Sequence, residues 1–119
     1  MTAKPHLQEL TPTQVHEALR EHTIVLIDVR EPQEYVTERI HGALLFPLST
    51  FDPLALPTGD RPVVLHCGSG KRSAMAVAKC MEAGVPVTVH MKGGILAWKH
   101  ARHPTVSLDP STGTVVDRR

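Results

Sequence analysis

The residue with the clearest potential for chemistry is Cys67, which ends an apolar run at residues 62–67. The turn that follows contains two glycines and two cations: Gly68, Ser69, Gly70, Lys71, Arg72 and then Ser73. Glycines at this spacing allow successive backbone N–H groups to point inward and form an anion-binding nest. A helix that begins near Arg72 adds its positive N-terminal end to the same point. We therefore expect Cys67 to be a thiolate at neutral pH and to act as a nucleophile.

Other interpretations of this turn explain less of it. A cysteine after an apolar strand is most often a small buried hydrophobic residue, but such a residue needs neither glycines nor cations beside it. The Walker A phosphate loop would require glycine in place of Leu65 and a hydroxyl residue in place of Arg72. The three-glycine dinucleotide pattern would require its last glycine in place of Ser73. These comparisons favour the nucleophile hypothesis.

The elements that position Cys67 alternate between short apolar runs and amphipathic stretches. Strands are predicted from apolar runs at residues 24–29, 43–48, 62–67 and 87–91, with a weaker one at 6–10. Helices are predicted at residues 11–21, 32–39, 71–83 and 95–101. This alternation predicts an α/β fold with a mainly parallel sheet. Active sites of such sheets lie beyond the carboxyl ends of the strands, which is where Cys67 stands.

Two of these helices carry specific signals. Thr11, Pro12 and Gln14 form a capping box at the start of the first helix. Its inner face is expected to carry Val15, Ala18 and Leu19. In the helix at residues 71–83, the apolar side chains at helical spacing are Ala74, Val77, Ala78 and Met81. Gly84 is the natural end of that helix.

Composition and charge exclude several classes of protein. The 119 residues fit one domain, and 41% hydrophobic with 21% charged residues is the composition of a soluble globular domain. The net charge of +1 argues against a nucleic-acid partner. No apolar run approaches the ~20 residues of a membrane span, and the first ten residues contain no signal core. Because the sequence has only two cysteines, we expect both to be reduced thiols, as is usual in a cytoplasmic protein. His100 and His103 have no cysteine or acid pair nearby, so no metal site is expected.

Residues 104–119 differ from the rest, because they lack helical periodicity and include turn chemistry at residues 109–113. This segment is either a hairpin packed on the domain or a mobile tail. We favour the tail, because Val115 and Val116 are its only late apolar residues. The expected division is a domain at residues 1–106 and a tail or small appended hairpin at residues 107–119.

Three motifs, in order over residues 10–106, resemble those of single-domain rhodaneses, a family of sulfurtransferases. The first comprises Asp28-Val29-Arg30-Glu31-Pro32, Glu34-Tyr35, Ile40-x-Gly42-Ala43 and Pro47. The second is the loop from Cys67 to Ser73, and the third is Gly93-Gly94-x-x-Ala97-Trp98. The resemblance implies a rhodanese-like three-layer α/β/α fold, with a five-stranded, mainly parallel sheet and helices on both faces.

The resemblance also implies a sulfur-transfer reaction without a cofactor. Cys67 would begin a six-residue active loop and attack the sulfane sulfur of thiosulfate or glutathione persulfide. The N–H groups from Gly68 to Ser73 would bind the resulting persulfide, while Lys71 and Arg72 would bind the anionic end of the donor. Cyanide, a thiol or an acceptor protein would then take the sulfur. The alternative is a rhodanese-like sulfur-carrier or binding module without efficient small-molecule turnover.

Loop length and one substitution refine this expectation. The related cell-cycle phosphatases have His-Cys, five residues and then arginine, whereas here Arg72 stands one position earlier and Ser73 takes that place. The shorter loop suits a single sulfur atom better than a phosphate. Many sulfurtransferases have arginine directly after the cysteine, where this sequence has Gly68. We therefore expect weak binding of thiosulfate, and this departure adds support for a persulfide donor with a larger organic group, so that both donors stay open.

The remaining candidates have mainly structural interpretations. Asp28 and Arg30, at the end of a central strand, either shape the rim of the pocket or form a structural ion pair, and we favour the ion pair. His66 is expected to pack beside the sheet rather than to act as a base for the thiol. Cys80 is expected to be a buried structural thiol, and Trp98 to belong to the core.

Overall fold

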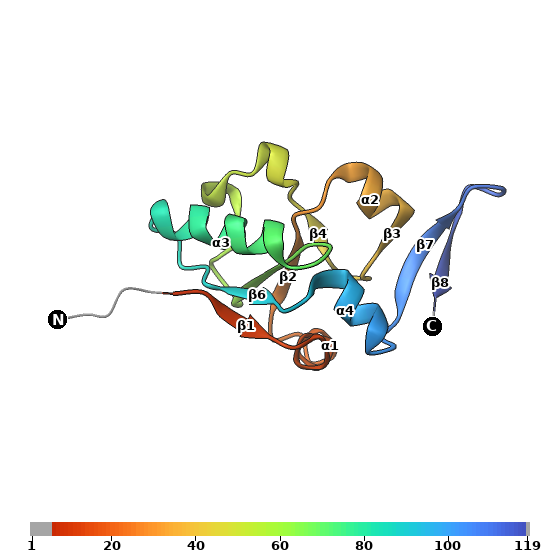
Figure 1. The fold of residues 1–119 in the computed structure, drawn as a ribbon, viewed down its shortest axis with the longest axis horizontal. Helices are drawn as coiled ribbons and strands as arrows, with labels where there is room; N and C mark the ends of the chain where they lie inside the picture. The colour runs from red at the N-terminus through yellow and green to blue at the C-terminus, as the bar shows by residue number, and fades with distance from the viewer. Residues whose placement is uncertain (1–5, 119) are drawn as a thin grey trace.

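Five short strands form a parallel sheet in the order β1-β6-β5-β2-β4 (Figure 1). The structure, a computed structural model, describes residues 6–118. Residues 1–5 of the expected domain and Arg119 of the expected tail therefore lie outside the described residues. The strands are β1 (Gln8–Leu10), β2 (Val25–Asp28), β4 (Leu44–Leu45), β5 (Val63–His66) and β6 (Val89–Met91). Every neighbouring pair is parallel, which confirms the predicted α/β fold.

Helices connect these strands at the predicted places. They are α1 (Pro12–Arg20), α2 (Pro32–Thr37), α3 (Lys71–Glu82) and α4 (Gly94–His100), with short 3₁₀ turns η1 (Leu48–Thr50) and η2 (Pro53–Ala55). The capping box of α1 is formed as predicted. Thr11 Oγ1 accepts a hydrogen bond from the Gln14 N–H at 3.1 Å, and Gln14 Oε1 accepts one from the Thr11 N–H at 2.8 Å.

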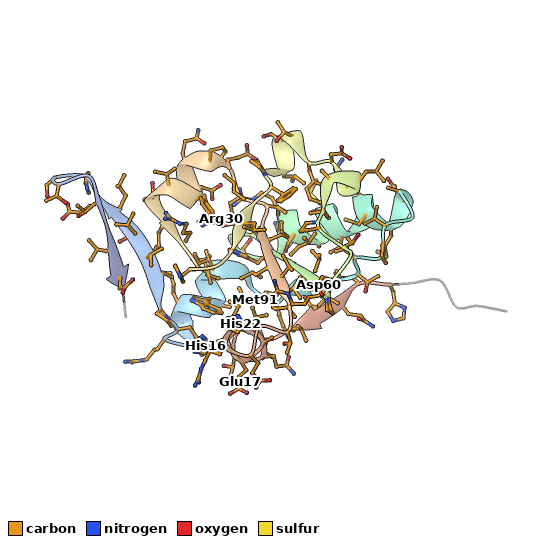
Figure 2. All side chains as sticks on the ribbon, turned by 180° about the vertical axis from the view of Figure 1, so that it is seen from behind. His16, Glu17, His22, Arg30, Asp60 and Met91 are labelled. Atoms are coloured by element: carbon orange, nitrogen blue, oxygen red, sulfur yellow. The ribbon has the colours of Figure 1, made fainter. Side chains whose placement is uncertain are left out.

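The sheet separates two hydrophobic cores. On one face, α3 and η2 pack over a core that includes Ile27, Leu65 and Val77. On the other, α1 and α4 cover a core that includes Leu26 and Trp98 (Figure 1). Consecutive residues of β2 therefore face opposite cores, and this explains why that strand is apolar without alternation. Figure 2 shows the opposite side of the molecule, with Met91 inside it and Glu17 on the outer edge of α1.

The buried face of α3 differs from the one that its apolar spacing predicts. Its buried residues are Ser73, Ala76, Val77 and Cys80, whereas the predicted set was Ala74, Val77, Ala78 and Met81. Only Val77 is common to both. The rotation of the helix is set by the loop before it, which directs Ser73 inward toward Cys67. Local hydrophobicity carries no information about that constraint.

A second, antiparallel sheet replaces the favoured C-terminal tail. It consists of β3 (Glu38–Arg39), β7 (Thr105–Asp109) and β8 (Thr114–Arg118), in the order β3-β7-β8. The expected boundary at residue 106 falls within β7, and the last two residues of the helix predicted at 32–39 are the strand β3. The prediction of a tail rests on the small number of apolar residues late in the chain. The segment is instead held by backbone pairing to β3 and by burial of Thr105 and Val106.

The start of α4 holds the loop that follows β5. The N–H of Ile95 donates to the carbonyl of Cys67 at 2.8 Å, and the N–H of Leu96 donates to that of Gly68 at 3.1 Å. Gly94 makes this approach feasible, because a Cβ there would collide with the backbone of Cys67 and Gly68. Its φ of +62° also favours glycine. The Gly93-Gly94 motif is therefore part of the support of the cysteine loop.

We predict that Gly94→Ala destabilises the protein more than Gly84→Ala does. Gly84 also has a positive φ, of +72°, but a Cβ there would meet nothing within 4 Å. Gly84→Ala should therefore cost only the left-handed strain of about 1–2 kcal/mol. Gly94→Ala adds a backbone collision worth about 1–3 kcal/mol more. Urea unfolding measures both, and equal losses in the two variants would contradict the steric support.

Candidate active site

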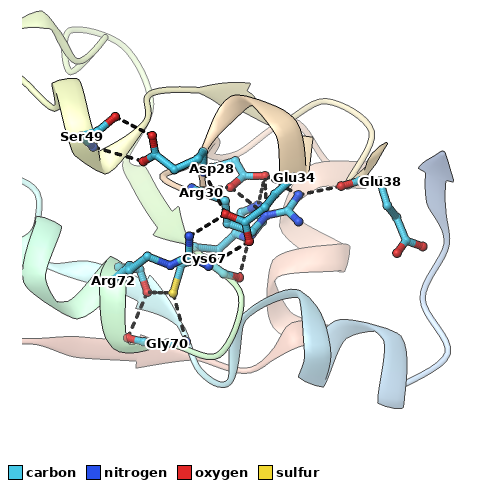
Figure 3. A network of polar contacts seen from close by, with 11 residues as sticks. Asp28, Arg30, Glu34, Glu38, Ser49, Cys67, Gly70 and Arg72 are labelled. Carbon is cyan, nitrogen blue, oxygen red and sulfur yellow. Dashed lines mark hydrogen bonds and ion pairs between the residues drawn. The ribbon is translucent and has the colours of Figure 1, made fainter. Parts of the chain in front are cut away.

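The thiol of Cys67 lies at the centre of the loop between β5 and α3 (Figure 3). Its Sγ accepts a hydrogen bond from the Gly70 N–H at 3.0 Å and lies 3.4 Å from the Ser73 hydroxyl. Gly70 is the N-cap of α3 and has a φ of +108°, so the helix begins directly beneath the sulfur. Of the backbone N–H groups expected to form a nest, that of Gly70 thus contacts the sulfur, whereas Ser73 contacts it through its side chain. Cys67 has no exposed surface.

A cleft of about 410 Å³ lies against this loop. It combines loop backbone, charged side chains of both signs and two apolar residues of α4; its lining residues are Arg30, Glu34, Glu38, Gly68, Ser69, Arg72, Ile95, Leu96 and Lys99. Of the two loop cations singled out from the sequence, Arg72 lines the cleft. Lys71 is exposed and is not part of the lining.

Arg72 forms a two-pronged ion pair with Glu34 of α2 (Figure 3). The Nη1–Oε1 distance is 2.6 Å and the Nη2–Oε2 distance is 3.0 Å. This hydrogen-bonded guanidinium lowers the pKa of Glu34 to about 2, against the opposing effect of burial and with help from the Glu31 N–H. Arg72 also lies over Gly68, where a Cβ would be 3.0 Å from its Nη2. The charge of Arg72, which we expect to bind the anionic end of the donor, is therefore paired with a carboxylate in this structure.

Asp28 and Arg30 form a buried ion pair with a shortest distance of 2.9 Å. Arg30 Nη2 also donates to the carbonyl of Glu38 at 2.7 Å, which connects the end of β2 to β3. Figure 2 shows Arg30 in the interior of the molecule. Arg30 is only 5% exposed and yet lines the cleft. The favoured ion pair is therefore present, and its cation also reaches the rim.

Lys99 is the third cation that lines the cleft, after Arg30 and Arg72. Its Nζ lies 2.8 Å from Glu38 Oε1, while Thr105 donates to Glu38 Oε2 at 2.6 Å. Burial disfavours the charged carboxylate, but these bonds outweigh it and lower the pKa of Glu38. The lining cations Arg30, Arg72 and Lys99 thus each contact a carboxylate. The sequence motifs include Glu34 but assign no site role to Glu34, Glu38 or Lys99, because these ion pairs join residues far apart in the chain.

The other sequence candidates lie where they were expected. His66 Nδ1 is 3.2 Å from the carbonyl oxygen of Cys67 and not at its thiol. Burial lowers the pKa of His66, so its imidazole is neutral at neutral pH. Cys80 is buried in the core, and this burial raises its pKa to about 11. Trp98 is buried and donates its Nε1–H to the carbonyl of Pro104 at 2.9 Å.

Comparisons with known proteins agree with the motifs. The family model described as a rhodanese-like domain matches residues 11–101. The protein slr1261 of Synechocystis sp. is 40% identical over 98 residues, which are 82% of this chain but only 55% of that protein. Thiosulfate sulfurtransferase GlpE of Pseudomonas paraeruginosa is 31% identical over 107 residues, which are 89% of this chain and 93% of that protein.

Solved structures share the fold. A rhodanese-related protein of Thermoplasma volcanium has a TM-score of 0.73 and 26% identity, over 83% of this chain and 97% of that one. Among residues 6–118, none of the helices has the length and apolar character needed to cross a membrane. The same residues contain no group of three or more His, Cys, Asp and Glu side chains arranged to hold a metal ion.

The Glu34–Arg72 pair should make the stability depend on pH on the acid side. The pKa of Glu34 in the folded chain, about 2, lies below its usual 4.5. The stabilisation is therefore fully present above about pH 4.5 and is lost as the pH falls toward about 2. Side-chain exposures of 34% for Arg72 and 39% for Glu34 limit it, through screening, to about 1 kcal/mol or less.

We expect Glu34→Gln to lower the free energy of unfolding at about pH 7 and to show a smaller further loss toward about pH 3 than the wild type. Urea titrations across this range measure the difference. Glu17→Gln removes an exposed carboxylate on the outside of α1 and should retain the wild-type pH dependence. Parallel pH curves for Glu34→Gln and the wild type would show that the pair does not stabilise the fold.

Proposed function

The chain belongs to the rhodanese-like domain family, and on this premise we propose that it is a sulfurtransferase whose sulfur carrier is Cys67. The observation that carries the proposal is the Gly70 N–H directed at Cys67 Sγ from the first turn of a helix. That arrangement stabilises negative charge on the sulfur. Relatives that this chain covers well are named thiosulfate sulfurtransferases, which supports the same reaction.

The reaction consists of two displacements at sulfur. The Cys67 thiolate attacks the outer, sulfane sulfur of the donor, and the donor's S–S bond breaks as sulfite or a thiolate leaves with the bonding electrons. This step leaves a Cys67 persulfide, whose terminal sulfur lies among the N–H groups of the loop. An acceptor thiolate or cyanide then attacks that sulfur and releases the Cys67 thiolate. The relay is ping-pong and calls for no cofactor.

Access to the thiol limits which donors react. Because Cys67 has no exposed surface, the donor sulfur reaches it only when the loop wall beside the cleft shifts. Gly68 and Ser69 form that wall, together with the Arg72 side chain over Gly68. A glycine at position 68 lowers the cost of such a shift, since this residue has no side chain of its own to repack. A donor whose terminal sulfur projects from the rest of the molecule can reach Cys67 through such an opening.

The paired charges of the cleft favour a zwitterionic donor over a small dianion. Thiosulfate would have to compete with Glu34 for Arg72 and with Glu38 for Lys99. Glutathione persulfide carries carboxylates and an ammonium group, so it meets partners of both signs along the same wall. A cleft of about 410 Å³ also has room for its organic portion. We therefore place glutathione persulfide, or a similar low-molecular-weight persulfide, ahead of thiosulfate as the donor.

The burial of the thiol also favours one alternative, a sulfur-carrier module that receives sulfur from a protein partner. Such a partner would open the loop by docking and would not require a free cation in the cleft. The two functions differ in turnover. A carrier becomes persulfidated once by a protein persulfide but does not turn over thiosulfate or glutathione persulfide with cyanide.

We predict that Cys67→Ser abolishes sulfur transfer to cyanide, because a hydroxyl neither ionises at neutral pH nor forms a persulfide. The wild type treated with donor should gain about 32 Da by mass spectrometry and lose it with cyanide. Cys80→Ser is the matched control, since that thiol is buried in the core, and it should retain both the adduct and the turnover. Turnover by Cys67→Ser would refute the mechanism.

We predict that Glu34→Gln lowers the KM for thiosulfate by roughly 3–10-fold, because it frees Arg72 to bind an anion. Arg72→Ala should raise that KM and slow the donor step more than the acceptor step. The KM for glutathione persulfide should change less in Glu34→Gln, because the lost carboxylate also meets the donor's ammonium group. Glu17→Gln controls for the change in net charge. An unchanged or higher KM for thiosulfate in Glu34→Gln would contradict the assignment of Arg72.

A further inference from the structure

A line of hydrogen-bonded side chains connects the Cys67 thiol to the far edge of the sheet. Ser73 Oγ of α3 lies 3.4 Å from Cys67 Sγ and 2.7 Å from His90 Nδ1 of β6. His90 Nε2 lies 2.9 Å from Glu9 Oε2 of β1. The strand register places Glu9 directly beside His90. Ser73 and His90 are buried, whereas the side chain of Glu9 is 46% exposed and meets water.

The chemistry of these groups fixes the direction of each hydrogen bond. An ionised carboxylate only accepts, so His90 donates its Nε2–H to Glu9. In the neutral imidazole, Nδ1 is then an acceptor, and the Ser73 hydroxyl donates to it at 2.7 Å in preference to the more distant Gly70 carbonyl at 3.3 Å. The free lone pair of Ser73 Oγ accepts from the Cys67 S–H. Every donor therefore points from the thiol toward Glu9.

The same atoms satisfy a second arrangement with the thiol ionised. The Cys67 proton moves to Ser73 Oγ while the Ser73 proton moves to His90 Nδ1, so one proton is transferred in total. Ser73 then donates to the thiolate, and the imidazolium donates to Ser73 through Nδ1 and to Glu9 through Nε2. The Gly70 N–H donates to the sulfur in both states. In neither state are Cys67 Sγ, Ser73 Oγ or the two ring nitrogens of His90 without a hydrogen-bond partner.

We propose that Ser73, His90 and Glu9 form a proton relay that serves the Cys67 thiol. Ser73 contacts the reacting sulfur, and His90 and Glu9 are positioning residues that act through it. The charge of Glu9 stabilises the imidazolium and hence the thiolate at the other end of the line. The proposal rests on the proposed function only in taking Cys67 as the nucleophile.

The surroundings of His90 make it suited to receive the proton. The titratable groups that meet it are Glu9, from β1, and Cys67, which reaches it through Ser73 of α3. On its other side, the sheet register places the apolar Leu65 of β5 beside it. If His90 had only a structural role, its hydrogen bonds would be sufficient and it would not have to accept a proton. An asparagine at position 90 keeps an amide that can bond to Ser73 but accepts no proton at neutral pH, and this separates the two roles.

The test is the pH profile of alkylation of Cys67 by iodoacetamide, followed by peptide mass spectrometry in the full chain. At about pH 7 we expect roughly 10²-fold slower alkylation in His90→Asn, the size of a general-base contribution. Glu9→Gln should slow it by roughly 3–10-fold, because the amide keeps the hydrogen bond and removes the charge. Both variants should approach the wild-type rate at high pH. Glu82→Gln, on the exposed end of α3, should match the wild type throughout.

A Glu9→Gln profile that coincides with the wild-type profile would overturn the relay. This variant is decisive even if His90→Asn fails to fold, because Glu9 is half-exposed and its substitution creates no cavity. A deficit that persists at high pH would likewise overturn it, since that indicates a displaced loop. Alkylation by iodoacetamide needs no sulfur donor, so the two proposals can fail separately. If the wild type forms no persulfide but the variants still show the expected slower alkylation, the proposed function is refuted and the relay remains intact.

Discussion

Two backbone hydrogen bonds from the start of α4 to the carbonyls of Cys67 and Gly68 determine where the thiol lies. They hold the loop from one side, while the Gly70 N–H holds Cys67 Sγ from the other. Gly94 has to be a glycine for α4 to come this close. The motif that contains Gly93-Gly94 therefore supports the motif from Cys67 to Ser73. The second motif forms the loop, and the third keeps the backbone of that loop in place.

Charge pairing is the second constraint on the site. The cleft contains several cations, but each meets a carboxylate from another element, as in the pairs Arg72–Glu34 and Lys99–Glu38. Such pairs tie α2 to α3 and β3 to α4, and they also leave the cleft with charges of both signs. In the function that we propose, the same contacts that hold the elements together also favour a donor with charges of both signs over a small dianion.

Much of the fold could be predicted from the sequence because its signals are local. Each of these signals depends only on residues close to it in the chain. They are the apolar run that ends at Cys67, the glycines after it and the capping box at Thr11, and the structure has each where it was predicted. The C-terminal hairpin was disfavoured because its stability comes from pairing with β3, which is distant in the chain. The predicted buried face of α3 was wrong for a similar reason. The preceding loop, and not the apolar spacing of the helix itself, directs Ser73 inward.

By itself the sequence determined the order of the helices and of the strands of the parallel sheet, the position of Cys67 and the length of the loop after it, because each is encoded within a few adjacent residues. Only the tertiary structure decided which side chains from distant segments connect to the loop of Cys67. Glu9, Glu34 and His90 come from three different elements, and no spacing along the chain relates them to Cys67. Glu9 and His90 come together because the parallel strands β1 and β6 place them side by side, whereas Glu34 reaches Arg72 of α3 from the helix α2.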